Sequence, residues 1–218
     1  MSWLRSAFQD ELDGVTSTLV ELSSIVSSAI EKATHALVNA DLAEAEEVIA
    51  ADDRIDHMQH ELDGRIIDII ARQQPVASDL RALVTALRMS ADLERMGDMA
   101  HHVAKITRLR HPQTAVPSEL LTSIEQMGKV AKTIADKAGA VINSRDVDKA
   151  LELERDDDEM DILHRKLFTI LLDDSWEHGI ETAIDITLIG RYYERFADHA
   201  VSVARRVYFL VTGKFSSE

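Results

Sequence analysis

The sequence contains no cysteine, which excludes a disulfide framework and any thiolate metal site. Proline and glycine are scarce, at 3 and 8 residues among 218, and aromatic residues make up only 5% of the chain. This composition disfavours a β-sandwich or a β-barrel and suits long helices. Hydrophobic residues still amount to 45%, so the chain can bury a core. We therefore expect an all-α fold.

Positive charge is also in short supply. Lysine and arginine number 24 against 39 aspartates and glutamates, for a net charge of -15 and an isoelectric point near 5.0. Such a balance argues against binding to nucleic acid, which depends on cationic side chains, and against an anionic membrane surface. No apolar run approaches the roughly eighteen residues of a membrane span, and the first residues lack the apolar core of a signal peptide. We expect a soluble, cytoplasmic protein without membrane insertion.

Helical periodicity is strong in both halves of the chain. Apolar residues recur in alternating steps of three and four over 12–36 and again over 120–141, which predicts a long helix in each stretch. Asp41 and Asp146 each stand where a second helix is expected to begin. The second helix of the first half is expected to end before Pro75, because the residue before a proline leaves the α region.

A third helix is expected in each half. In the first half it should run from Ser78 and Asp79, which are candidate capping residues, to about Leu109. The stretch 111–117 holds two of the three prolines and is the only one with the composition of a linker. In the second half the corresponding connection between helices is expected around 176–179.

The two halves are related by an internal duplication. One offset aligns their first two helices, and a second offset, after the shorter connection, aligns their third helices. We predict two tandem three-helix bundles with six long helices, one over residues 1–111 and one over 112–218. A chance match between two coiled-coil-like segments is the alternative. Under the duplication, four acidic residues of the first half fall on four of the second: Asp52, Asp56, Glu94 and Asp98 on Asp157, Asp161, Glu194 and Asp198.

These eight residues form four pairs with i, i+4 spacing, so each pair lies on one face of a helix, about one turn apart. In an antiparallel hairpin, residues equally far from the turn lie at the same height. Both pairs of each half are equally far from the predicted turn, which lies at Pro75 in the first half and at Glu177-His178 in the second. We therefore expect four carboxylates to meet in each hairpin, about 30 Å from its turn.

Four carboxylates in one place need compensation by metal ions or by arginines. Two unit charges about 6 Å apart repel by roughly 3 kcal/mol at an effective dielectric constant of about 20. A solvated acidic face would use nearby arginines, namely Arg54, Arg95, Arg165 and Arg195. Arg95 and Arg195 directly follow a glutamate, however, and are expected to point about 100° away from it. Gly97 and its counterpart Ala197 are small, which indicates space for an ion or a close approach of two helices.

Carboxylate sites suit hard cations such as magnesium, manganese or calcium, and also iron or zinc with added solvent ligands. A carboxylate-bridged di-metal oxidase is a competing hypothesis, but it needs Glu-x-x-His on each of two helices. Asp98 with His101 and Asp161 with His164 come closest, and neither has a counterpart in the other half. His199 is a possible further ligand, although a surface or core role is the simpler interpretation.

Three segments carry a resemblance to a known family: 73–81 (QQPVASDLR), 92–98 (DLERMGD) and 191–200 (RYYERFADHA). Together with similarity over nearly the whole chain, they resemble the PhoU family of phosphate-uptake regulators. The resemblance implies two similar three-helix bundles, and E(D)-x-x-x-D motifs that bind multinuclear iron or zinc clusters in some members. The matching positions are the eight acidic residues named above. Phe196-Ala197 depart from the usual Ile-Gly, so the second repeat matches the family motif less closely than the first.

The resemblance also implies a function. PhoU-like proteins are negative regulators of phosphate-starvation genes, and they link the ATPase subunit of the phosphate ABC transporter to a phosphate-sensing histidine kinase. The residues agree, because the sequence has no nucleotide-binding or hydrolase motif. We therefore expect a metal-binding adaptor without enzymatic activity, with the oxidase and a purely structural helical scaffold as alternatives. Long helix faces that one chain cannot cover also predict a homodimer or docking to partner helices.

Overall fold

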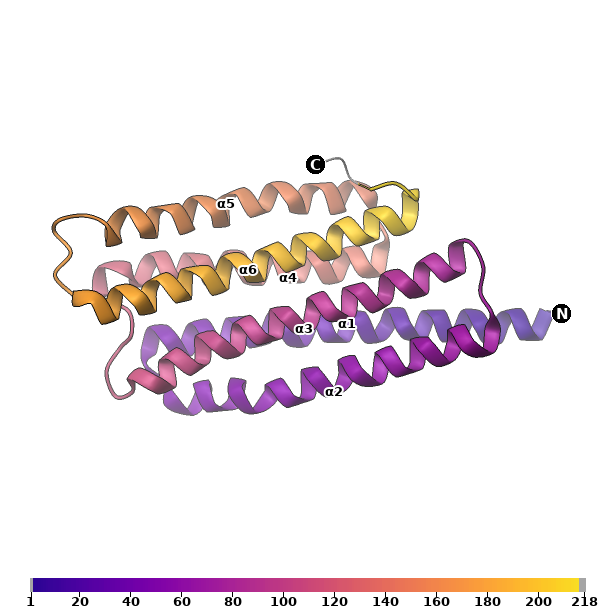
Figure 1. The fold of residues 1–218 in the computed structure, drawn as a ribbon, viewed down its shortest axis with the longest axis horizontal. Helices are drawn as coiled ribbons and strands as arrows, with labels where there is room; N and C mark the ends of the chain where they lie inside the picture. Colours follow the sequence, from indigo (N-terminus) through magenta and orange to yellow (C-terminus); the bar gives the residue numbers. More distant parts are fainter. Residues whose placement is uncertain (1, 216–218) are drawn as a thin grey trace.

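The computed structural model describes residues 2–215, with side chains from Ala7 onward, and within that range it contains helices and no strand. A short 3-10 turn, η1 (Ser118–Leu120), precedes the fourth helix. The prediction of six long helices in two three-helix units is confirmed. The helices are α1 (Ser2–Asn39), α2 (Leu42–Gln73), α3 (Ser78–Arg110), α4 (Leu121–Ser144), α5 (Val147–Leu171) and α6 (Gly179–Thr212) (Figure 1).

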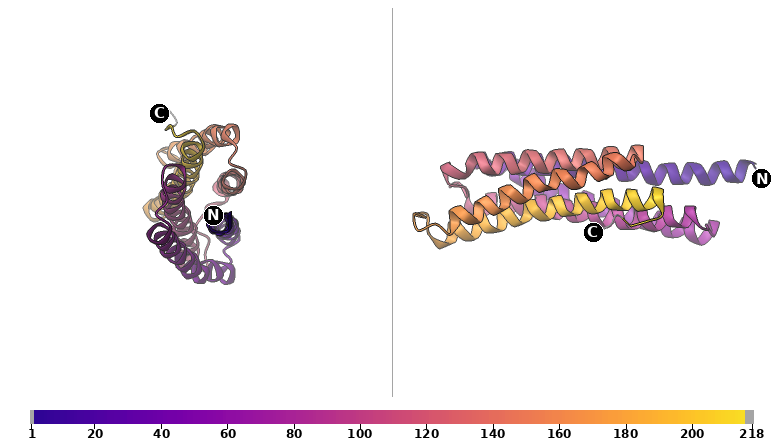
Figure 2. Two further views of the ribbon diagram at one scale, coloured as in Figure 1. Left: turned by 90° about the vertical axis from the view of Figure 1, so that its right-hand side faces the viewer. Right: turned by 90° about the horizontal axis from the view of Figure 1, so that it is seen from above.

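The six helices pack in two layers. One layer holds α2, α3, α6 and α5 side by side, and the other holds α1 and α4, as the end-on view in Figure 2 shows. Each repeat contributes one helix to the smaller layer and two to the larger. The α2–α3 hairpin and the α5–α6 hairpin therefore lie on either side of the α3–α6 contact. None of the helices in the described part of the chain is long and apolar enough to cross a membrane.

The two repeats share one hydrophobic core. Gly128 allows α4 to approach α1 closely, because a Cβ atom there would collide with the side chain of Thr34. The hydroxyls of Thr34 and Tyr193 form a buried hydrogen bond of 2.7 Å between α1 and α6. Along the α3–α6 contact, Arg110 binds Asp185 through two hydrogen bonds of 2.5 and 3.1 Å. Contacts between repeats thus hold α3 and α6 in register.

Two of the predicted helix starts are confirmed. The carboxylate of Asp41 accepts a hydrogen bond from the backbone N–H of Glu44 at 3.1 Å, and Asp146 accepts two such bonds at the start of α5. The predicted caps of α3 are wrong. Ala77 is the N-cap, with φ of 50° and no side-chain capping bond, and the Ser78 hydroxyl donates to Asp79 instead of accepting from the backbone. Because the chain turns sharply at Ala77, Ser78 already lies inside the helix.

Candidate metal-binding clusters

The structure brings together the four acidic side chains predicted in the first repeat, which we call the first cluster: Asp52 and Asp56 from α2, Glu94 and Asp98 from α3. All four are partly buried. Burial raises the pKa of Asp52, His101 lowers it, and Asp56 and Asp98 raise it again. Burial also raises the pKa of Glu94, and the carboxylate of Asp98 adds to this effect. The carboxylates therefore lie close enough to repel one another, as equal distances from the turn predict.

His101, which follows Asp98 at the i+3 spacing noted in the sequence, belongs to the first cluster. Its Nδ1 atom is hydrogen-bonded to a carboxylate oxygen of Asp52, and the two side chains are only 17% and 13% exposed. Its other ring nitrogen, Nε2, is buried without a hydrogen-bond partner in the described structure, and so is Oδ1 of Asp56. Buried polar atoms without partners are rare in proteins, so these two are candidates for contact with a ligand.

Arg95 compensates part of the charge of the first cluster, so the expectation that it points away is wrong. Its Nη1 atom lies 3.0 Å from Oδ2 of Asp98, and its Nε atom lies 3.6 Å from Glu94. The reason is the length of the arginine side chain, which reaches the residue at i+3 on the next turn. Arg54 does not contribute, because it pairs with Glu21 on α1 at 3.4 Å.

Gly97 lies between Glu94 and Asp98 where α3 approaches α2 closely. A Cβ atom at this position would lie 3.0 Å from Cδ1 of Ile55 and 3.6 Å from Oδ1 of Asp52. The nearest atoms thus belong to the apolar side chain of Ile55, which is buried between Asp52 and Asp56. Of the two explanations for a small residue here, a close helix approach has direct support in the structure.

The second cluster consists of the counterparts Asp157 and Asp161 from α5, and Glu194 and Asp198 from α6. Burial raises the pKa of Asp157 to about 6, with further contributions from Asp198, Asp161 and Glu194. The four carboxylates therefore also meet in this hairpin. Asp161 and Asp198 are more exposed than their counterparts in the first repeat.

A different arginine serves the second cluster. Glu194 accepts from Nη1 of Arg191 at 2.5 Å, whereas Arg195 forms no ion pair within the described residues. This agrees with the expectation that Arg195, which directly follows Glu194, points away from it. Arg191 lies three residues before Glu194 on the same face of α6, where a salt bridge forms readily. Arg165 makes a longer contact of 3.9 Å with Asp161.

A histidine also lies beside the second cluster, but from the other helix of the hairpin. Burial raises the pKa of Glu194, and His164 of α5 is one of the two groups that oppose this effect. The Nε2 atom of His164 is buried without a partner in the part of the chain that the structure describes. His101 and His164 each come from a single helix of their hairpin, so neither cluster has the Glu-x-x-His on two helices that a di-metal oxidase requires. His199 lies outside the cluster and contacts Asp92 at 3.2 Å between the repeats, as its simpler interpretation predicts.

As the side chains stand, no group of three or more histidine, aspartate or glutamate residues in the described chain is arranged to hold a metal ion. In the first cluster, His101 already binds an oxygen of Asp52, and Arg95 binds an oxygen of Asp98. The donor set nevertheless fits a hard cation, because each cluster contains four carboxylates. In the first cluster, the buried Oδ1 atom of Asp56 also has no hydrogen-bond partner within the described residues. To bind a metal ion, Asp52 would have to release His101 and Asp98 would have to release Arg95.

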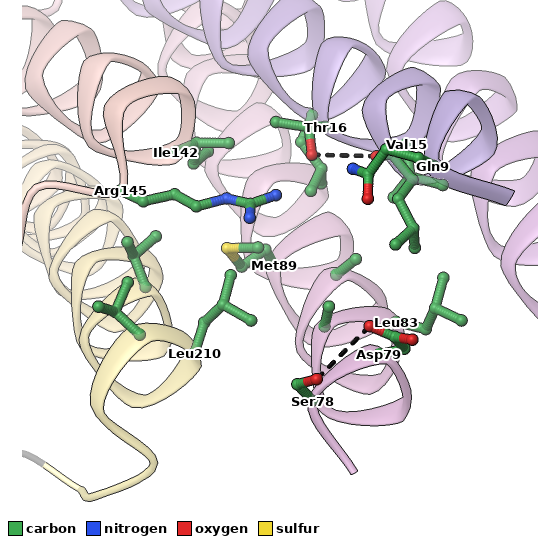
Figure 3. A pocket seen from close by; sticks show the side chains of 16 residues that line it. Gln9, Val15, Thr16, Ser78, Asp79, Leu83, Met89, Ile142, Arg145 and Leu210 are labelled. Atoms are coloured by element: carbon green, nitrogen blue, oxygen red, sulfur yellow. Dashed lines mark hydrogen bonds between the residues drawn. The ribbon is translucent and has the colours of Figure 1, made fainter. Parts of the chain in front are cut away.

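The two most voluminous hollows among those found in the described residues lie elsewhere, and none of the eight carboxylates lines either of them. One, of about 420 Å³, lies among the ends of α1, α3, α4 and α6. Figure 3 shows Arg145 extending into it toward Met89, with Ser78 and Asp79 on the far side. The other, of about 560 Å³, lies between the start of α3 and the end of α6. The sequence carries no signal for either hollow, because each is assembled from both repeats.

Fold and clusters together define a class of protein: a duplicated three-helix bundle with four carboxylates gathered in the hairpin of each repeat. Comparison with protein families agrees with this class. A PhoU domain model matches residues 19–107 and 124–207, one match in each repeat. The chain belongs to the PhoU family, and the resemblance in its sequence is confirmed.

Relatives cover the chain from end to end. It is 46% identical, over 97% of its length and 100% of the relative, to the phosphate-specific transport system accessory protein PhoU homolog 2 of Mycobacterium tuberculosis. It is 44% identical to homolog 1 of Mycobacterium leprae, over 99% of this chain and 97% of that one. Among solved structures, PhoU from Pseudomonas aeruginosa is similar with a TM-score of 0.84 and 30% identity, over 95% of this chain and 100% of that one.

Proposed function

We propose that this protein is a cytoplasmic negative regulator of phosphate uptake and phosphate-starvation signalling. In this role it links the ATPase subunit of the phosphate ABC transporter to a phosphate-sensing histidine kinase, and it acts without enzymatic activity. The observation that carries the proposal is family membership over both repeats and the whole chain. Relatives at this level of identity are named as accessory proteins of the phosphate-specific transport system.

Deletion of the gene tests the regulatory role. Loss of the protein should derepress phosphate-starvation genes while phosphate is plentiful, as measured with a transcriptional reporter. The tagged protein should also retain the transporter ATPase in a pull-down. Reporter expression that is unchanged in the deletion strain would contradict the proposal, whatever the metal content of the protein.

We further propose that both clusters bind metal ions. The residues that would hold them are Asp52, Asp56, Glu94 and Asp98 in the first cluster and Asp157, Asp161, Glu194 and Asp198 in the second. Support comes from the raised pKa values of Asp52, Glu94, Asp157 and Glu194, each caused first by burial. Bound metal would supply positive charge that offsets burial and repulsion together. All-oxygen donors suit magnesium, manganese or calcium, and the adjacent histidines extend the set to iron or zinc.

Elemental analysis of the purified protein and of two variants tests the metal proposal. Asp98→Asn removes a carboxylate from the first cluster, so bound metal and metal-dependent thermal stability should both fall, and chelator should have the same effect on the parent. Asp53→Asn is the matched control, because Asp53 is an exposed neighbour of Asp52 that lies outside the cluster. Coincident melting curves for parent and Asp98→Asn, with and without chelator, would exclude the site.

We also propose that the protein associates through apolar side chains left exposed outside the clusters, as a homodimer or with a partner. Leu172 and Ile180, at the turn between α5 and α6, are each 81% exposed. Exposed apolar patches commonly mark contact surfaces. Light scattering should show a species larger than the 24.3 kDa monomer at micromolar concentration. A monomer that captures no partner would count against this proposal.

A further inference from the structure

We propose that the groove between the start of α3 and the end of α6 binds an acidic amphipathic helix of a partner protein. The groove spans about 560 Å³ and goes beyond the regulatory role and the metal clusters, neither of which requires it. Residues from both repeats line it, among them Leu80, Arg81, Val84 and Arg88 from the α3 side and Phe209 and Phe215 from the α6 side.

The groove carries concentrated positive charge in a protein whose net charge is -15. Four arginines line it and no acidic residue does. The charges of Arg205 and Arg206 are already paired within the protein. Arg205 donates a hydrogen bond to Glu154 at 2.7 Å, and Arg206 donates one to Asp92 at 2.5 Å. Arg88 is exposed and pairs with no acidic side chain within the described residues. The side of the groove formed by α3 therefore presents uncompensated charge to solvent.

Arg81 adds to this charge and is held in place by packing rather than by an ion pair. Its guanidinium lies 5.9 Å from the ring centre of Phe209, and a Cβ atom at Gly213 would collide with it. The Nε atom of Arg81 is buried without a hydrogen-bond partner in the described structure. An anionic group in the groove would give this arginine the partner it lacks.

Apolar side chains lie next to the arginines. Leu80 and Val84 are spaced four residues apart on the outward face of α3, and each is 39% exposed. On the opposite side, Phe209 stacks on Phe215 with ring centres 4.5 Å apart and an interplanar angle of 12°. Phe215 itself remains 76% exposed. The groove thus has an apolar strip and a charged strip that run side by side along α3.

These two strips select the chemistry of the occupant. Free phosphate or nucleic acid would use the arginines but leave Leu80, Val84 and Phe215 in water. An amphipathic helix with apolar residues at i, i+3 or i+4, and i+7 and carboxylates beside them would satisfy both strips. The part of α3 that lines the groove, residues 77–88, is about 16 Å long, which matches about three turns of such a helix.

Photo-crosslinking tests the proposal in the full-length protein. A benzophenone amino acid replaces Val84, and the crosslinked segment is identified by mass spectrometry from cells of the organism that encodes the chain. We expect a segment with net negative charge and apolar residues at helical spacing. A synthetic peptide of that segment should bind the purified parent, and the charge reversal Arg88→Glu should weaken binding about tenfold or more, with further loss at high salt.

Two matched controls separate the groove from general effects of charge and exposure. Lys166→Glu makes the same change in net charge on an exposed residue of α5, and Leu109→Asp introduces a carboxylate at an exposed apolar residue at the other end of α3. Neither should alter peptide binding, whereas Arg88→Glu and Val84→Asp should. The proposal is overturned if no segment crosslinks, if the crosslink joins two copies of this chain, if the segment is neutral or basic, or if Arg88→Glu binds the peptide as well as the parent does.

Discussion

The two carboxylate clusters have the same four acidic positions but different cationic neighbours. In the first cluster, His101 from α3 binds Asp52 and Arg95 binds Asp98. In the second, His164 comes from α5 and Arg191 binds Glu194, while Asp157 has only carboxylates among the charged groups that shift its pKa. The duplication has thus kept the spacing of the acidic residues and not the groups that neutralise them.

This difference separates two properties of the site. Spacing along each helix and equal distance from the turn determine that four carboxylates meet, and both repeats retain these features. Any long basic side chain that reaches the cluster can neutralise its carboxylates, so the neutralising residue can stand at one of several positions in the sequence. Without metal, the negative charge of the second cluster is less well compensated than that of the first, and the pKa of Asp157 is raised to about 6. We therefore expect variants of the two clusters to differ in metal content and stability.

Disabling one cluster at a time should have the largest effect. The double variant Glu94→Gln with Asp98→Asn should lose the metal of the first cluster only, and Glu194→Gln with Asp198→Asn that of the second. At about a hundredfold excess of metal over its Kd, each bound site stabilises the fold by about 2.7 kcal/mol, which should disappear with the site. Elemental analysis and melting curves measure both. If one double variant loses all the metal, the clusters are not independent.

A single neutral substitution should stabilise the metal-free protein in the second cluster. Asp157→Asn removes a carboxylate that is buried among others, so the free energy of unfolding at pH 7.5 should rise by about 1 kcal/mol, after allowance for solvent screening. Asp52→Asn should gain less, because it also weakens the contact with His101. Denaturant unfolding in chelator measures both, with Asp53→Asn as the control. Equal gains for the two variants would remove the contrast between the clusters.

The advantage of Asp157→Asn should depend on pH. The pKa of Asp157 is raised from 3.8 to about 6 on folding, so the folded state binds a proton more tightly than the unfolded state between these values. Above about pH 6 the variant should therefore be more stable than the parent by the full amount. As pH falls from about 6 to about 4, Asp157 of the parent becomes protonated and this difference in the free energy of unfolding should disappear. Unfolding of both proteins in chelator across this range measures the gap. A gap that widens on acidification would show that Asp157 is stabilised as a carboxylate.

The smallest effect is expected at Gly97. Gly97→Ala gains roughly 1 kcal/mol of helix propensity, but the new Cβ lies 3.0 Å from Ile55, so the two contributions should nearly cancel. The reverse change at its counterpart, Ala197→Gly, has no such compensation and should cost about 1 kcal/mol. Melting curves and metal content of both variants decide the role of the small residue. If Gly97→Ala binds less metal but is as stable as the parent in chelator, Gly97 keeps space for an ion.

Much of the fold could be predicted because its signals are local. Heptad spacing, the capping aspartates Asp41 and Asp146, and Pro75 each act within a few residues, so helix bounds followed closely from them. The cap of α3 could not be predicted in this way. Ser78 and Asp79 have the right chemistry, but the positive φ of Ala77 places them one step inside the helix. Backbone conformation at a turn depends on how the two helices it joins must pack, which the residues of the turn do not reveal.

Two repeats, six helices and the meeting of four carboxylates in each hairpin could all be predicted from the sequence. These follow from a fixed rise per residue and a fixed helical period, which convert spacing along the chain into height and direction. Only the tertiary structure decided which cations reach each cluster, and that Arg81, Arg88 and Phe209 share one groove. Those contacts depend on the register of α3 against α6. Side-chain packing across the shared core sets that register, and no local periodicity records it.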